Sequence, residues 1–392
     1  MLRKIRLGLE KLLGDSRNLV SGRRVGLVAH PASVTGDLRH ALDVLIESGA
    51  NVRILFGPEH GFGGEAQDME PVDGATAGPR GIPLVSLYGS SAETLAPTAD
   101  HLTGLDALVV DLADVGSRYY TFAWTAVLCL EACHRAGVDM ILTDRPNPIG
   151  GEAVEGAPQQ EGYLSFVGLR PVPNRHGMTV GELALFSAAL DGTADALTVV
   201  KMDGWERCMT YEDTGLPWVL PSPNMPTVET ALVYPGGCLI EGTWASEGRG
   251  TTRPFELIGA PAVDPSRMAD VLGKMDLPGV AFRPVAFRPT FQKHAGIACG
   301  GVQLHVTDRR AFRPYRTGVA TLIALERCAP DFEWRADPYE FVDDIPAIDL
   351  LAGSPDVREG IEQGAELEEI CRTWISGQED FVHNHRGKQI YD

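Results

Sequence analysis

The chain has 392 residues, of which 44% are hydrophobic and 22% are charged, the proportions of a globular protein long enough for two domains. Lys and Arg total 34 against 53 Asp and Glu, and the formal net charge of −19 argues against nucleic acid or an anionic membrane surface as a partner. No apolar run approaches the length of a membrane span.

The N-terminus predicts an amphipathic first helix and not a signal peptide. Residues 1–13 begin with basic side chains, but Glu10 and Lys11 interrupt the apolar stretch and no small-residue cleavage site follows. The 7 cysteines are scattered and odd in number, which is typical of small buried side chains in a reducing compartment. We therefore expect a cytoplasmic protein.

Over the first 200 residues, strand patterns alternate with helix patterns. Short apolar runs predict strands at 24–30, 52–56, 83–87, 107–111, 139–143 and 197–201. Helical patterns lie at 40–49, 92–102, 123–136 and 179–190. This alternation is typical of parallel βαβ units, so we expect an α/β fold with a doubly wound, mainly parallel sheet. No Gly-x-Gly-x-x-Gly turn follows the first strand, so dinucleotide binding is unsupported.

The composition changes after about residue 204. Residues 204–261 are rich in Gly, Pro and Trp and contain few periodic stretches. A strand pattern at 301–306 and helix patterns at 315–327 and 357–376 follow. We expect a first domain over 1–205 and a smaller α+β domain over 206–392.

Four short clusters combine glycine or proline with polar and ionisable side chains, at 57–61, 144–148, 221–226 and 239–253. The last one holds two glutamates, two arginines and three glycines in fifteen residues. Glycines that let a backbone come close, beside charges of both signs, indicate a polar small-molecule site and therefore an enzyme. The alternative is a set of well-capped turns.

Charged side chains follow the carboxyl ends of the predicted strands. In open α/β sheets this edge is where ligands bind. We therefore expect five residues to share one crevice: Glu59, Asp111, Asp114, Arg118 and Asp144.

Glu59 is the strongest candidate for a catalytic group. It comes just after a buried strand, between Pro58 and His60, where partial shielding from water would favour the protonated form that a general acid needs. The alternative is a helix cap or an ion pair. Asp111 and Asp114 could bind a sugar hydroxyl, orient an arginine or supply a second carboxylate, and an N-cap role is equally compatible.

Paired carboxylates, as in glycoside hydrolysis, fit the residue types best. Glu241 and Glu247 flank Trp244, and an aromatic ring beside acids suits a sugar, although a lone Trp is more often part of a core. The sequence lacks a Gly-x-Ser-x-Gly elbow and a His-Glu-x-x-His metal motif. We expect neither a catalytic metal nor a cofactor.

The clusters, in this order, resemble the NamZ-type exo-β-N-acetylmuramidases, a bacterial family long known only as a domain of unknown function. The resemblance rests on motifs spread over nearly the whole chain: 24–28, 57–61, 114–121, 144–148, 221–226, 241–243, 246–251 and 301–305. It implies a hydrolase that removes a terminal N-acetylmuramic acid from the non-reducing end of peptidoglycan fragments. It also implies a Rossmann-like domain, a smaller auxiliary domain, a cleft between them, and Glu59 as the catalytic glutamate.

N-acetylmuramic acid carries a lactyl carboxylate, which an acidic protein would repel without local compensation. Arg118, Arg145 and Arg249 each lie inside a motif, and an arginine can clamp a carboxylate in bidentate fashion. Arg249 is the preferred candidate because Gly248 and Gly250 leave its backbone free to approach a ligand.

The expected site therefore has a catalytic set and a substrate-binding set. The catalytic set is Glu59, Glu241 and Glu247. The substrate-binding set is His60, Asp111, Asp114, Arg118, Tyr120, Asp144, Arg145, Asn147, His176, Asn224 and Arg249.

Two other functions remain compatible with these residues. One is a muropeptide-binding protein without activity, and the other is a metal-dependent amide or ester hydrolase acting on amino sugars. The partner in each case is a peptidoglycan-derived disaccharide or muropeptide. Because relatives in this family often carry secretion signals, the substrate could be cell-wall debris outside the cell or imported muropeptide.

Overall fold

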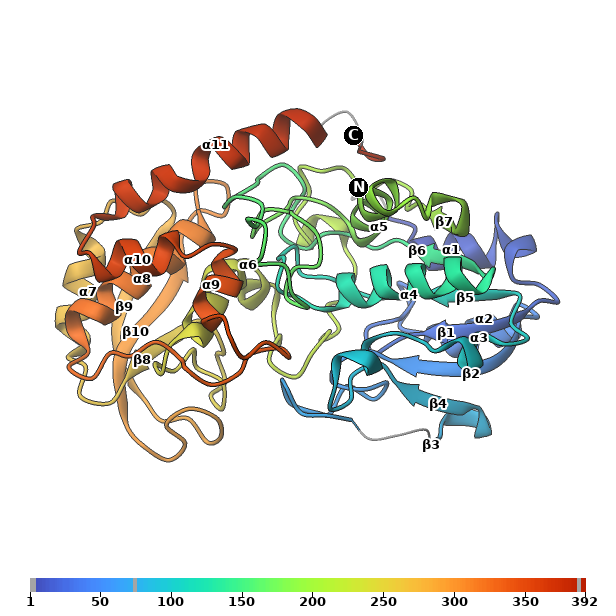
Figure 1. The fold of residues 1–392 in the computed structure, drawn as a ribbon, viewed down its shortest axis with the longest axis horizontal. Helices are drawn as coiled ribbons and strands as arrows, with labels where there is room; N and C mark the ends of the chain where they lie inside the picture. The colour runs from blue at the N-terminus through green and yellow to red at the C-terminus, as the bar shows by residue number, and fades with distance from the viewer. Residues whose placement is uncertain (1–4, 73–75, 386–388) are drawn as a thin grey trace.

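A computed structural model describes residues 5–72, 76–385 and 389–392. Its larger sheet has the strand order β3-β4-β2-β1-β5-β6-β7, in which all neighbours are parallel except the edge strand β3 (Figure 1). The strands are β1 (Arg24–Val28), β2 (Asn51–Gly57), β3 (Thr76–Ala77), β4 (Pro83–Ser86), β5 (Ala107–Val110), β6 (Asp139–Thr143) and β7 (Leu197–Val200). This confirms the predicted parallel α/β architecture.

Helices cover both faces of the larger sheet. On one face α1 (Gly8–Leu13) packs against β6 and β7, and α2 (Ala41–Glu47) packs against β2. On the other face α4 (Phe122–Ala136) lies against β6, and α5 (Val180–Asp191) lies against α4 and β7. Because both faces are buried, β5 is apolar at every position and β6 is apolar at three consecutive positions, Met140 to Leu142, and not only at alternate ones.

The second sheet has three antiparallel strands in the order β8-β10-β9. These are β8 (Leu257–Ala260), β9 (Val280–Phe287) and β10 (Cys299–Val306). The helix α7 (Pro265–Gly273) packs on β9 and β10, and α8 (Pro314–Cys328) packs on α6 (Val228–Gly237). This smaller unit fits the expected α+β domain.

The C-terminal segment returns to the first half of the chain. The long helix α11 (Leu367–His385) runs across the molecule, and its Phe381 packs against Phe186 of α5 (Figure 1). The Tyr391 hydroxyl then donates a hydrogen bond of 2.7 Å to Oδ2 of Asp144. The boundary near residue 205 stays a prediction.

Two predicted helices are each broken into two. Residues 92–102 form a 3₁₀ turn (Ala92–Leu95) and a short helix α3 (Ala99–Leu102), because Pro97 lacks an amide hydrogen and Thr98 caps a new start. Residues 357–376 belong to α10 (Asp356–Glu362) and α11, which are separated by Gly364 at a φ of 72°.

Other expectations need smaller corrections. The first helix begins only at Gly8, since Arg6 pairs with Asp203 in a β-bridge, and residues 1–4 lie outside the described residues. The stretch 204–261 contains the helix α6 and the strand β8, neither of which its composition predicts.

The cysteines form no disulfide bonds. All seven cysteines are free, and six are buried while Cys208 is exposed. Within the described residues, no helix combines the length and the apolar character needed to cross a bilayer.

Candidate active site

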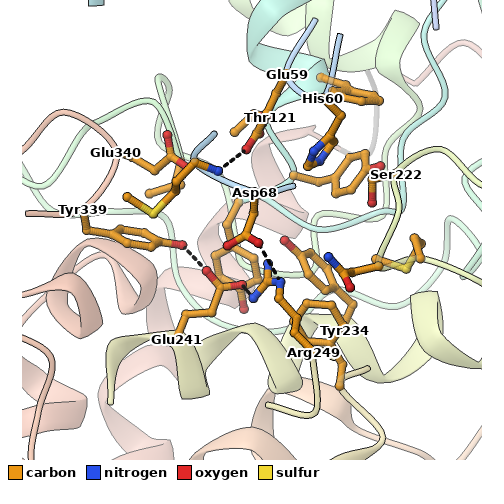
Figure 2. Close-up of a pocket in the computed structure, with 18 residues that line it drawn as sticks. Glu59, His60, Asp68, Thr121, Ser222, Tyr234, Glu241, Arg249, Tyr339 and Glu340 are labelled. Carbon is orange, nitrogen blue, oxygen red and sulfur yellow. Dashed lines mark hydrogen bonds and ion pairs between the residues drawn. The ribbon is translucent and has the colours of Figure 1, made fainter. Parts of the chain in front are cut away.

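Residues from four sequence motifs line one pocket where the larger sheet faces the C-terminal half (Figure 2). The carboxyl end of β2 supplies Glu59 and His60, and the start of α4 is preceded by Tyr120 and Thr121. Ser222 and Asn224 come from the Pro-rich cluster, and Glu241 and Arg249 from the Gly-rich cluster. The pocket encloses about 520 Å³ of empty space, which includes its opening to solvent.

Glu59 is buried in this pocket and both of its oxygens are held. The Thr121 hydroxyl donates to Oε2 at 2.6 Å, and the Met69 amide donates to Oε1 at 3.3 Å. The tight turn before it depends on Gly57, where a Cβ would lie 2.4 Å from the Phe62 nitrogen. The next residue, His60, has a φ of 69°, and its Nδ1 lies 2.9 Å from the Ala66 carbonyl.

Arg249 lies among three carboxylates. Its Nη1 is 2.7 Å from Oε1 of Glu241, and its Nε is 3.2 Å from Oδ1 of Asp68. Figure 2 shows Glu59 and Glu241 on different sides of the pocket, with Asp68 between them. Burial raises the pKa of Asp68, although Arg249 opposes this shift.

Glu247 is buried behind the pocket and does not line it. Its Oε2 is 2.9 Å from Nζ of Lys293, and its Oε1 is 3.1 Å from Nη1 of Arg249. Burial alone would raise the pKa of Glu247, but Lys293 and Arg249 lower it to about 2. Glu247 therefore stays ionised, with both oxygens engaged, and these contacts favour a role in holding Arg249, while its expected catalytic role stays a prediction.

Comparison with known proteins identifies the family. The sequence model of the N-terminal part of exo-β-N-acetylmuramidase NamZ matches residues 25–229, and that of the C-terminal part matches residues 232–391. The chain belongs to the NamZ family.

Individual relatives agree with this membership. The chain is 43% identical over 390 residues to the peptidoglycan β-N-acetylmuramidase NamZ of Bacillus subtilis, covering 99% of this chain and 92% of that protein. Two DUF1343 family proteins of Bacteroides fragilis have the same fold in crystal structures. One has a TM-score of 0.87 at 32% identity and covers 99% of both chains. The other has a TM-score of 0.76 at 28% identity, and the match covers 100% of this chain and 99% of that protein.

The family models and the Bacillus subtilis relative are named as β-N-acetylmuramidases, which are glycosidases. The chain is therefore an enzyme of the glycosidase class.

The structure does not bring the five residues that were expected at the strand ends into one crevice. Of these five, only Glu59 lines the pocket. Asp111 and Arg145 are buried outside the Glu59 pocket, where the guanidinium binds the carboxylate through two bonds of 2.7 Å. Arg145 also donates to the Val34 carbonyl at 2.8 Å. These partners engage both side chains, so we assign them to holding the ends of β5 and β6 together.

Arg118 is also buried away from the pocket. It donates to the carbonyls of Ala157 at 3.1 Å, Val172 at 2.9 Å and Leu351 at 2.6 Å. These contacts are all with backbone carbonyls and do not correspond to the expected carboxylate clamp.

Asp144 holds the start of α5. Its Oδ2 accepts hydrogen bonds of 2.7 Å from the Thr179 and Tyr391 hydroxyls, and its Oδ1 accepts one of 2.9 Å from the Gly181 amide. Burial raises the pKa of Asp144 to about 6. Such a position is structural, and it lies outside the residues that line the Glu59 pocket.

Of the remaining predicted residues, three lie outside the Glu59 pocket and two line it. Asp114 accepts from the Gly116 amide at 2.6 Å and lies 3.5 Å from Nε2 of His176. Asn147 donates to the Met178 carbonyl at 2.9 Å, and none of these three lines the Glu59 pocket. Asn224 does line it and donates to Oε1 of Gln67 at 2.9 Å. Tyr120 lines it too, with a buried hydroxyl that has no hydrogen-bond partner among the described residues.

Sequence reasoning missed two acidic residues of the pocket, Asp68 and Glu340. Asp68 lies in a loop eleven positions after β2, and Glu340 lies on a loop between α8 and α9 (Ala347–Ala352). Neither follows a strand end. The one available signal was local: Glu340 is an acid placed between two aromatic residues, Tyr339 and Phe341.

Proposed function

We propose that this chain is an exo-acting β-N-acetylmuramidase that releases N-acetylmuramic acid from the non-reducing end of peptidoglycan fragments by carboxyl-group chemistry. The observation that carries the proposal is the buried Glu59, held by Thr121 and Met69 on one side of a pocket that other acids line. Hydrolysis of a glycosidic bond needs two carboxyl groups of opposite protonation state around one anomeric carbon. Family membership and the 43% identity to a peptidoglycan β-N-acetylmuramidase support the substrate class.

The contacts of Glu59 bear on which role it takes. The sequence analysis expects the acid that protonates the leaving group. A hydroxyl and an amide both donate to its oxygens, and such donors stabilise the ionised carboxylate. We therefore propose that Glu59 supplies the negative charge that faces the anomeric carbon.

The E59Q variant tests this role. We expect the fold and the Michaelis constant to change little, and turnover to fall by at least about 10²-fold, because the Gln amide carries no negative charge and loss of one preorganised electrostatic contact typically costs about 10²–10³-fold. The measurement is release of free N-acetylmuramic acid from a muramic acid glycoside, with a thermal melt to check folding.

The matched control is E65Q, which removes an exposed carboxylate from the same loop. It should behave as the wild type. Near-normal turnover in E59Q would remove Glu59 from the mechanism. A wild-type protein that binds the glycoside but releases no sugar would establish the binding-protein alternative instead.

A further inference from the structure

We propose that Glu340 is the second catalytic carboxyl group of this pocket and the one that donates a proton to the departing sugar. The proposal rests on the proposed glycosidase function. It assigns a role to a residue that no strand end or sequence motif pointed to. Glu340 is buried and lines the same pocket as Glu59, although the two belong to opposite halves of the chain.

The backbone at Glu340 is held in a conformation that its residue type disfavours. The amide of Tyr339 donates to the carbonyl of Val342 at 2.9 Å, and the amide of Val342 donates back to the carbonyl of Tyr339 at 3.0 Å. The two central residues of this turn, Glu340 and Phe341, have φ values of 45° and 68°. Turns of this kind favour Asn-Gly, because both central residues must have positive φ. Strain at two side-chain-bearing residues is typical of functional sites.

Neighbouring side chains fix the turn on both sides. The Tyr339 hydroxyl donates to Oε2 of Glu241 at 2.8 Å. The Tyr88 hydroxyl donates to Oε2 of Glu340 at 3.0 Å, and the Tyr88 ring meets the Phe341 ring edge-on at 5.7 Å. Figure 2 shows Glu340 beside Tyr339 on the Glu59 side of the pocket. The carboxyl group of Glu340 is therefore positioned by contacts from both halves of the chain.

The charges around Glu340 differ from those around the other pocket acids. Glu241 and Asp68 contact Arg249, and Glu59 accepts from a hydroxyl and an amide. Within the described residues, Glu340 has no ion pair, and its carboxyl group is surrounded by Tyr88, Glu59, Glu241 and Asp68.

This environment favours the protonated form of Glu340. Burial, and then the neighbouring Glu59 carboxylate, hold the pKa of Glu340 well above its usual range. When two carboxyl groups face one buried pocket, a proton is held more favourably by the group that has no cation or amide donor beside it, which here is Glu340.

The step that follows is balanced. The proton of Glu340 bonds to the glycosidic oxygen as the bond from that oxygen to the anomeric carbon breaks, and the electron pair stays with the oxygen. The leaving sugar departs as an alcohol, while the Glu59 carboxylate stabilises the positive charge at the anomeric carbon. A water molecule then bonds to that carbon through its oxygen, and its released proton restores Glu340.

The test compares two substrates in E340Q and in the wild type. One is a muramic acid disaccharide, whose leaving sugar must be protonated. The other is a dinitrophenyl muramic acid glycoside, whose leaving group departs as a stable anion. We expect E340Q to lose about 10²–10⁴-fold in kcat/KM on the disaccharide and less than about tenfold on the dinitrophenyl glycoside. We expect kcat/KM of the wild type to fall at alkaline pH as Glu340 loses its proton, and we expect this fall to be absent in E340Q.

Two further variants keep the test decisive. Y88F removes the donor that stabilises ionised Glu340, so the pKa of Glu340 should rise and the alkaline fall should move to higher pH. D337N removes an exposed acid three positions away and should leave both substrates and the pH profile unchanged. If E340Q does not fold, the Y88F profile decides.

Several results would overturn the proposal. Equal losses of E340Q on both substrates with the alkaline fall intact would mean a structural role. An E59Q variant that shows the leaving-group dependence would put the proton on Glu59. A Y88F variant in which kcat/KM falls at the same alkaline pH as in the wild type would also contradict the proposal. Failure of the wild type on both substrates would instead refute the proposed function.

Discussion

Three arginines inside sequence motifs have different environments, and their partners decide what each can bind. Arg145 is engaged by the Asp111 carboxylate, and Arg118 by three backbone carbonyls. Arg249 alone of the three lines the Glu59 pocket, with its guanidinium 4.8 Å from the centre of the Phe255 ring. Its ion pairs with the three neighbouring acids are made by Nη1 and Nε, so we expect Nη2 to be the atom that donates to a substrate carboxylate.

At this scale we predict that R249A narrows the preference for muramic acid over N-acetylglucosamine glycosides. Losing a charge-assisted hydrogen bond to the lactyl carboxylate costs about 1.5–3 kcal/mol, roughly a tenfold to hundredfold change in the ratio of kcat/KM values. The ratio is the useful measurement because general damage to the pocket affects both sugars.

The matched control is R253A, in the same Gly-rich cluster, whose side chain is 46% exposed and pairs with Glu256. Its preference should stay at the wild-type value. If R249A keeps that value too, Arg249 only balances the charges of Asp68, Glu241 and Glu247, and discrimination between the sugars lies elsewhere.

Among the elements, the ends of neighbouring parallel strands serve different purposes. The end of β2 delivers Glu59 to the pocket. Asp111 follows β5, and its carboxylate binds Arg145. Asp144 follows β6, and its carboxylate accepts a hydrogen bond from the start of α5. The strand-end rule for ligand binding therefore holds for one strand and misleads for two.

Arg118 connects elements that are far apart in the sequence. Its three carbonyl partners belong to two loops of the first half and to α9, and Nδ2 of Asn174 donates to the same Leu351 carbonyl at 2.8 Å. Burial lowers the pKa of Arg118 to about 10, which leaves it charged at neutral pH.

We predict that R118M destabilises the protein by several kcal/mol. The substitution leaves three carbonyls without this donor, and an unsatisfied buried polar group costs about 1–3 kcal/mol. Urea unfolding of the purified protein measures the loss. R39A, at an exposed pair with Glu47, is the control and should change the free energy of unfolding by less than about 1 kcal/mol. An R118M variant as stable as R39A would contradict this account.

At the scale of the whole molecule, the proposed function requires an acidic protein to bind an anionic sugar in an acidic pocket. The formal net charge is −19, and four carboxyl groups line a pocket with one arginine. The long-range field therefore repels the substrate, and only local contacts offset it.

We predict that kcat/KM for a muramic acid glycoside rises when ionic strength increases from 0.01 to 0.15 M. Salt shortens the Debye length from about 30 Å to about 8 Å, which screens distant carboxylates more than buried contacts. The methyl ester of the lactyl group, which has no charge, is the control and should show no such rise. A fall with salt for the acid substrate would mean that local cations dominate.

The order and type of most elements of the larger sheet follow from local sequence patterns, because each depends on apolar runs and turn residues within a few positions. It also placed Glu59, His60, Tyr120, Asn224, Glu241 and Arg249 in motifs that do line the pocket. The breaks at Pro97 and Gly364 are local too, and could have been predicted from proline and glycine chemistry.

Local patterns do not reveal which charged residues face the pocket and which face one another, because this depends on the packing of distant segments. Asp111 and Glu59 both follow strands. Arg145 comes from a neighbouring strand end and binds Asp111. Glu59 instead accepts a hydrogen bond from Thr121, and it has no arginine partner among the described residues. Glu340 comes to the pocket from a loop 281 positions after Glu59, through a hydrogen bond to Tyr88. Pairings between distant segments depend on how the two halves pack, and no local pattern in the chain encodes them.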